Sequence, residues 1–68
     1  MQSSIITIDP EIQSGQPVFK GTRVPIKSLF DYLSTGESLE NYLTDYPYVK
    51  REQALSLLKI AGALFLKI

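Results

Sequence analysis

Few residues in this chain could carry out covalent chemistry. Its 68 residues include no histidine and no cysteine, which removes the commonest general base and the most nucleophilic side chain. The hydroxyls, carboxylates and lysines that remain show no nucleophile and base at a recognisable spacing. Asp9 and Glu11 flank Pro10, a pattern more typical of a solvated turn than of a metal site. The sequence therefore predicts a protein that is not an enzyme and has no metal, no cofactor and no small-molecule substrate.

The segment from Gly15 to Pro25 contains two glycines, two prolines and two cations within eleven residues. Its glycines match neither the spacing of a P-loop nor that of a dinucleotide-binding loop, so they indicate turn geometry. Lys20 and Arg23 remain as candidates for binding a partner. A guanidinium can bind the acidic metal site of a nuclease through two hydrogen bonds. The alternative, at least as well supported by the sequence, is that Arg23 pairs with a carboxylate of its own fold.

A short β arm precedes this segment. Ile5-Ile6-Thr7-Ile8 is β-branched throughout and Asp9-Pro10 ends it, which predicts a strand. Val18-Phe19-Lys20 could form the second arm of a hairpin. An isolated two-stranded ribbon is marginal in water, so pairing within the chain and pairing with a second chain both remain open.

Three amphipathic helices are expected after the arm. The first begins at Pro25 and ends at Gly36, and the second begins at the N-cap Ser38 and ends at Tyr46. The third begins near Lys50, so the short connection predicts a helix-turn-helix. The expected fold is mainly α: a three-helix, homeodomain-like domain with a short N-terminal β-strand or hairpin arm. We expect one domain over 1–68, with the β arm and junction in 1–24 and the helices in 25–68.

The start of the third helix offers two interpretations. Lys50, Arg51 and Gln53 could reach phosphates and base edges in a DNA major groove, or they could be solvated surface. Seven basic residues balance seven acidic ones, so bulk charge does not draw the chain to nucleic acid. The tyrosines could stack on bases, but their spacing beside leucines favours the rim of the core; they are Tyr32, Tyr42, Tyr46 and Tyr48.

The third helix is apolar nearly all round, which predicts burial on more than one side. Three small helices cannot surround it, so we expect a homodimer that uses its last turns and the terminal strand. The expected interface residues are Ile5, Ile6, Ile8, Ala61, Leu64, Phe65 and Ile68. The apolar run from Leu57 to Ile68 is too short to span a membrane, and residues 1–4 do not resemble a secretory signal. The expected location is the cytoplasm.

Two motifs at fixed spacing resemble a known family. They are Gly15-Gln16-Pro17-Val18-Phe19-Lys20-Gly21-Thr22-Arg23-Val24 and Asp45-Tyr46-Pro47. From Ile5 to about Ala61 the chain is similar to the family catalogued as domain of unknown function 433. It departs from the family at Tyr48 and Lys50, where a glycine and a Ser/Thr cap are usual.

The resemblance implies a small helix-turn-helix domain similar to VapB-type antitoxins, which are often encoded beside a PIN-like ribonuclease toxin. By that likeness the protein would neutralise a toxin and bind operator DNA. The departures from the family at the turn and at the helix start bear on DNA binding. The second hypothesis is a dimeric protein-protein interaction module without DNA binding.

Overall fold

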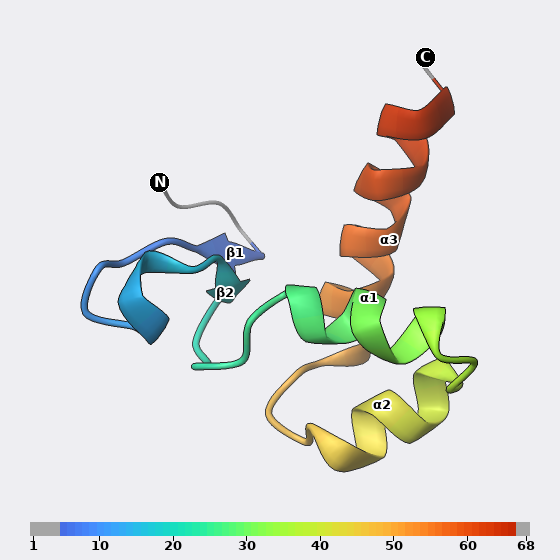
Figure 1. Cartoon of the computed structure of the whole chain (residues 1–68), viewed down its shortest axis with the longest axis horizontal. Coiled ribbons are helices and arrows are strands. Elements are labelled where there is room, and N and C mark those ends of the chain that lie inside the picture. The colour runs from blue at the N-terminus through green and yellow to red at the C-terminus, as the bar shows by residue number, and fades with distance from the viewer. Residues whose placement is uncertain (1–4, 67–68) are drawn as a thin grey trace.

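The computed structural model describes residues 5–66, with side chains described through residue 64. Two short strands and three α-helices follow one another along the chain. They are β1 (Ile6–Thr7), β2 (Val18–Phe19), α1 (Lys27–Ser34), α2 (Leu39–Asp45) and α3 (Arg51–Leu66), with a 3-10 turn at Gln13–Gly15 before β2. Figure 1 shows the hairpin on one side of the molecule and the three helices on the other. The prediction of a mainly helical domain with an N-terminal hairpin arm is confirmed.

The hairpin pairs within one chain. β1 and β2 run antiparallel, with Ile6 opposite Phe19 and Thr7 opposite Val18. Val18 and Phe19 are fully buried, and Phe19 packs in the same cluster as residues of all three helices and of the α2–α3 connection. Packing against helices therefore supplies the stability that a two-stranded ribbon lacks alone.

The core joins segments that are distant in sequence. Its buried side chains come from β2, from each helix and from the α2–α3 connection: Phe19, Leu29, Tyr42, Val49, Ala54 and Leu57. The hydroxyl groups of Tyr42 and Ser28 lie 2.8 Å apart and share a hydrogen bond. The largest buried residue thus has its polar atom satisfied, as burial requires.

The helices end where the local signals predict. Gly36 adopts a φ of +87°, a left-handed conformation that ends many helices and that costs little free energy at glycine. The Ser38 hydroxyl accepts a hydrogen bond from the Asn41 N–H at 3.0 Å and caps α2. α2 stops before Tyr46-Pro47, because proline disfavours a helical conformation in the residue before it.

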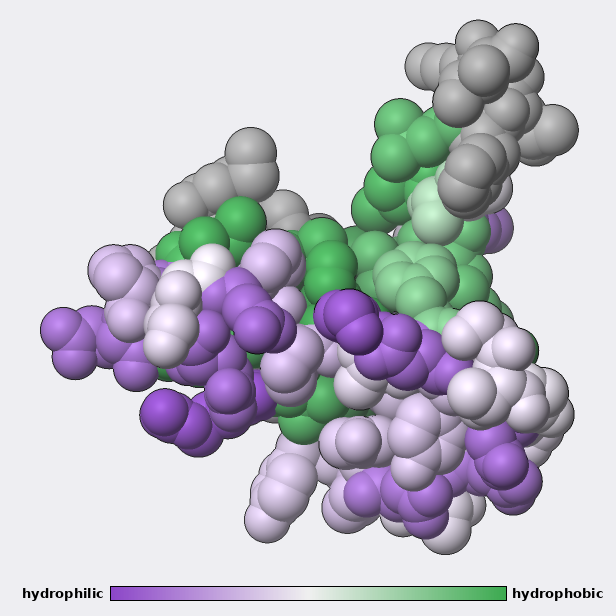
Figure 2. Space-filling view, in the orientation of Figure 1, coloured by the Kyte–Doolittle hydropathy of each residue, from purple (hydrophilic) through white to green (hydrophobic). Residues whose placement is uncertain are grey.

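α3 extends past the rest of the molecule (Figure 1). Leu57, Ile60, Ala61 and Leu64 are spaced at i, i+3, i+4 and i+7, so they share one face. Leu57 is buried, Ala61 is half-buried, and Ile60 and Leu64 are 49% and 63% exposed. The face that packs in the core therefore continues beyond what the described residues cover, and Figure 2 shows the apolar surface of α3 on that part of the molecule. No helix within residues 5–66 is both long and apolar enough to cross a membrane.

Candidate functional site

The Gly21-Thr22-Arg23-Val24 motif forms a tight loop after β2. The Thr22 hydroxyl donates to the Phe19 carbonyl at 2.8 Å and accepts from the Val24 N–H at 3.0 Å. The Phe19 N–H in turn donates to the Val24 carbonyl at 3.0 Å. Gly21 has a φ of +80°, which a residue with a side chain rarely adopts. Glycine and threonine therefore fix the loop, and Arg23 is presented at its surface.

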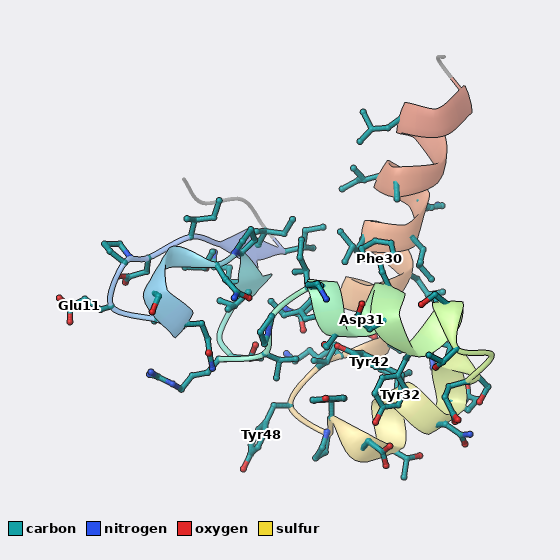
Figure 3. The ribbon with its side chains drawn as sticks, in the orientation of Figure 1. Glu11, Phe30, Asp31, Tyr32, Tyr42 and Tyr48 are labelled. Carbon is teal, nitrogen blue, oxygen red and sulfur yellow. The ribbon has the colours of Figure 1, made fainter. Side chains whose placement is uncertain are left out.

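An open groove of about 530 Å³ lies beside this loop. Its walls come from β1, the β1–β2 connection, the loop and the α2–α3 connection: Thr7, Ile12, Gly21, Thr22, Arg23, Val24 and Tyr48. Most of this lining is apolar, and among the described residues Arg23 is its one charged member. Tyr48 is 80% exposed and projects away from the helices (Figure 3). We call this feature the Arg23 groove.

Arg23 has no carboxylate within salt-bridge distance in the part of the chain that the structure describes. Its backbone carbonyl accepts a hydrogen bond from the Gln13 amide at 3.1 Å, which holds the loop, and the residue itself is exposed. Among the described residues Arg23 therefore lacks the carboxylate partner that the alternative prediction requires. Lys20 is exposed as well, and its backbone N–H donates to the Ile5 carbonyl at 2.9 Å.

The three predicted DNA contacts at the start of α3 differ in the interactions that their side chains already make within the chain. Arg51 forms a two-pronged ion pair with Glu40 of α2, with Nη2 and Oε2 2.8 Å apart. The guanidinium lowers the pKa of the Glu40 carboxyl through its hydrogen bonds and charge, and the carboxylate raises that of Arg51. Glu40 also explains how a cation is tolerated at a helix N-terminus, where the helix dipole opposes it.

Both polar atoms of the Gln53 side-chain amide form hydrogen bonds. Its oxygen accepts from the Lys50 N–H at 3.0 Å, and its nitrogen donates to the Lys20 carbonyl at 3.0 Å. The side chain of Lys50 is exposed and makes no ion pair with the described residues. Lys50 is therefore the predicted DNA contact that is already available to a ligand.

Tyr32 and Tyr46 are half-buried at the predicted core rim, whereas Tyr42 is fully buried in the core itself. Their ring centroids are separated by 5.2 Å (Tyr32–Tyr42), 5.6 Å (Tyr32–Tyr46) and 4.8 Å (Tyr42–Tyr46). The Tyr32 hydroxyl donates to Asp45 at 2.6 Å, and this hydrogen bond is the main cause that raises the pKa of Tyr32 to about 12.

The prediction is wrong for Tyr48, which is exposed. Pro47 ends the helical spacing before it, and the neighbouring Val49 takes the buried position instead. Tyr48 becomes a wall of the Arg23 groove.

The residues predicted for a dimer interface occupy two regions. Ile5 and Ile6 pack at the edge of the core, and Ile8 is half-buried. Ala61 and Leu64 lie on the uncovered face of α3. The side chain of Phe65 and the whole of Ile68 lie outside the described residues, and the predicted interface stays a prediction.

The sequence did not single out Thr7, Ile12 or Tyr48 as site residues. Thr7 and Ile12 have no distinctive spacing, and only the hairpin turn brings them beside the loop. The one available signal was Tyr48, one of the two positions at which the chain departs from the family that it resembles. Within residues 5–66 no three acidic side chains gather in a way that could hold a metal ion.

Comparison with known proteins places these features in a family context. The model of a family described as "Protein of unknown function (DUF433)" matches residues 6–61. "Uncharacterized protein y4eO" of Sinorhizobium fredii is 37% identical over 49 residues, which cover 72% of this chain and 22% of that protein. The chain thus corresponds to about a fifth of that relative. No solved structure matches the chain significantly.

Proposed function

The chain belongs to the DUF433 family of proteins of unknown function, and we propose that it is an antitoxin-like protein that neutralises a PIN-like ribonuclease toxin. The observation that carries the proposal is the exposed Arg23 guanidinium, which has no carboxylate partner in the described part of the chain and lines an apolar groove. A guanidinium placed in this way is available for the acidic residues of a partner. Lys20 adds a second exposed cation at the same loop.

A nuclease that uses a metal ion holds it with carboxylates, so its active site is an acidic hollow. Arg23 can enter such a hollow and bind a carboxylate through two hydrogen bonds, which excludes the metal or the RNA phosphate. The rigid loop set by Gly21 and Thr22 limits the conformational entropy lost on binding.

Growth rescue tests this role. The chain is expressed with the nuclease-like protein encoded beside it, and we expect co-purification and rescue of growth. Arg23→Ala should lose most of the rescue, whereas Lys27→Ala, which removes another exposed cation, should retain it. Full rescue by Arg23→Ala would remove Arg23 from the interface, and absence of any complex with the wild-type chain would refute the antitoxin role itself.

Operator DNA is a second partner in this proposal, favoured by Lys50, whose side chain makes no ion pair with the described residues and lies at the start of the helix that would enter the major groove. Arg51 could join it only by leaving Glu40. The Lys50→Ala/Arg51→Ala double variant should weaken binding to the DNA upstream of the gene and reduce its salt dependence. Unchanged affinity in a gel-shift titration would remove this assignment.

The alternative function is a dimeric interaction module without DNA binding, favoured by the uncovered face of α3. Ile60 and Leu64 continue a face whose Leu57 is buried, and a second copy could cover them. Leu64→Glu should then shift the chain from dimer to monomer in sedimentation velocity. Ala63→Glu introduces the same charge off that face and should leave the dimer intact; a wild-type monomer at all concentrations tested would contradict the module.

A further inference from the structure

We infer that the Arg23 groove binds an extended segment of a partner protein in which an acidic side chain stands between large apolar ones. This inference rests on the proposed role as a protein-binding module and specifies which chemistry that partner presents. Its basis is the contrast between the charged and apolar parts of one groove.

Arg23 sets the charge of the ligand. It is the one charged residue among the seven described residues that line the groove, and no described carboxylate neutralises it. An anionic group is therefore the complementary ligand, and a carboxylate matches the planar fork of a guanidinium with two parallel hydrogen bonds.

The apolar walls set the rest of the ligand. Ile12 and Val24 supply aliphatic surface, and Tyr48 presents an aromatic ring that is 80% exposed. A groove of about 530 Å³ has room for a few side chains of a partner. Because exposed apolar surface gains free energy when it is covered, the residues beside the acidic group should be large and apolar.

These walls favour a protein segment over nucleic acid. A phosphate backbone would place strongly hydrated charges against Ile12 and Val24, at a cost in desolvation. The chain as a whole also has zero formal net charge, so it offers no field that would attract a polyanion. A protein segment with one acidic side chain among apolar neighbours places no hydrated phosphates against these walls and needs no long-range field to bind.

The first arm of the test uses small probes and amide NMR on the full chain. Phenylacetate carries a ring and a carboxylate, and phenethylamine carries the same ring with a cation. Phenylacetate should shift the amide signals of residues 21–24 and 48 with a dissociation constant on the order of 1 to 10 mM, as expected for a fragment. Phenethylamine should leave them unchanged. Equal shifts with both probes, or shifts confined to other residues, would overturn the inference.

The second arm uses blocked peptides, Gly-Leu-Asp-Phe-Gly and its matched amide Gly-Leu-Asn-Phe-Gly. The acidic peptide should bind about tenfold more tightly, because only it presents a carboxylate to Arg23. Arg23→Gln should abolish this preference, Arg23→Lys should retain part of it, and Tyr48→Ala should weaken both peptides. Arg23 and Tyr48 are both solvent-exposed, so unchanged dispersion of the amide spectrum serves as the folding control.

Other outcomes assign the groove differently. Binding of phenylacetate without either peptide would indicate a small carboxylic acid and overturn the protein segment. Shifts caused by inorganic phosphate but not by phenylacetate would indicate nucleic acid or a phosphorylated group, and would overturn it too. None of these readouts requires the toxin, so the inference can fail while growth rescue succeeds, and the reverse.

Discussion

The Gln53 side chain donates a hydrogen bond to the Lys20 carbonyl oxygen at 3.0 Å. Lys20 is the residue after β2 and Gln53 belongs to the first turn of α3, so this bond ties the hairpin arm to the helical part of the chain. The same side chain accepts from the Lys50 N–H, which is one half of a capping box. One amide thus positions both the Arg23 loop and the start of α3.

Removing this amide should loosen both elements. Gln53→Ala loses both hydrogen bonds and should lower the free energy of unfolding by about 1–2 kcal/mol. Gln53→Glu keeps the acceptor for the Lys50 N–H but loses the donor to Lys20, so it should cost less. Urea denaturation measures the free energy of unfolding of both variants, and Gln16→Ala, at an exposed residue, serves as the control. Equal stability of Gln53→Ala and the wild type would show that the link is not formed in solution.

The other half of the capping box is missing and can be supplied. The Lys50 carbonyl accepts the first helical hydrogen bond from the Ala54 N–H at 3.2 Å, so Lys50 is the N-cap, but its side chain has no oxygen to accept a bond. Lys50→Ser should stabilise the chain by about 1 kcal/mol, because it adds the cap and removes a cation from a helix N-terminus. Lys59→Ser within α3 should be neutral or slightly destabilising in the same urea experiment. Stabilisation by both variants alike would point to net charge as the cause.

The sequence predicts most of the fold because its helix ends carry local signals. Gly36, Ser38 and Pro47 each act on the backbone within three residues, so their effect does not depend on the rest of the chain. The hairpin was predicted from β-branched residues, but its pairing within the chain depends on the packing of Phe19 in the helical core. That packing is a tertiary property.

The candidate site was predicted only in part for the same reason. Arg23 stands out in a motif, yet the groove beside it requires Ile12 and Tyr48 to meet across the fold. Arg51 and Glu40 are eleven residues apart and on different helices, so no helical spacing rule identifies their ion pair. Charge and type mark a residue as a candidate, and tertiary contacts decide whether it is available.

The Arg51–Glu40 pair predicts a pH-dependent stability. The hydrogen bonds and charge of Arg51 lower the pKa of Glu40 from its ordinary value of 4.5, so folding favours the ionised carboxylate. This contribution is complete above pH 4.5 and is lost as the pH falls through the folded pKa. The wild type should therefore be more stable than Glu40→Gln at neutral pH, and the gap should close on acidification.

Urea midpoints across acidic to neutral pH measure this gap. Glu11→Gln, which removes an exposed carboxylate that forms no ion pair with the described residues, serves as the control and should show a smaller gap. Glu40→Gln should also suppress most of the effect of Arg51→Gln, because the two residues share one interaction. Additive effects of the two substitutions would contradict the pairing.

Tyr32 should lose its proton at a higher pH than an ordinary tyrosine does. Its hydroxyl donates to the Asp45 carboxylate at 2.6 Å, and that bond, with smaller contributions from desolvation and nearby charge, raises the pKa from 10.0 to about 12. Because the folded pKa lies above the unfolded one, the bond stabilises the chain fully below pH 10 and its contribution is lost as the pH rises through 12.

Asp45→Asn should lower the pKa of Tyr32 toward 10, since an amide gives no charge to oppose the tyrosinate. Tyrosinate absorbance between these pH values should therefore be larger in Asp45→Asn than in the wild type, and Tyr32→Phe should remove the difference. Asp31→Asn, on α1 and paired with Lys27, should titrate like the wild type; a difference that survives in the Asp45→Asn/Tyr32→Phe double variant would assign the effect to another tyrosine.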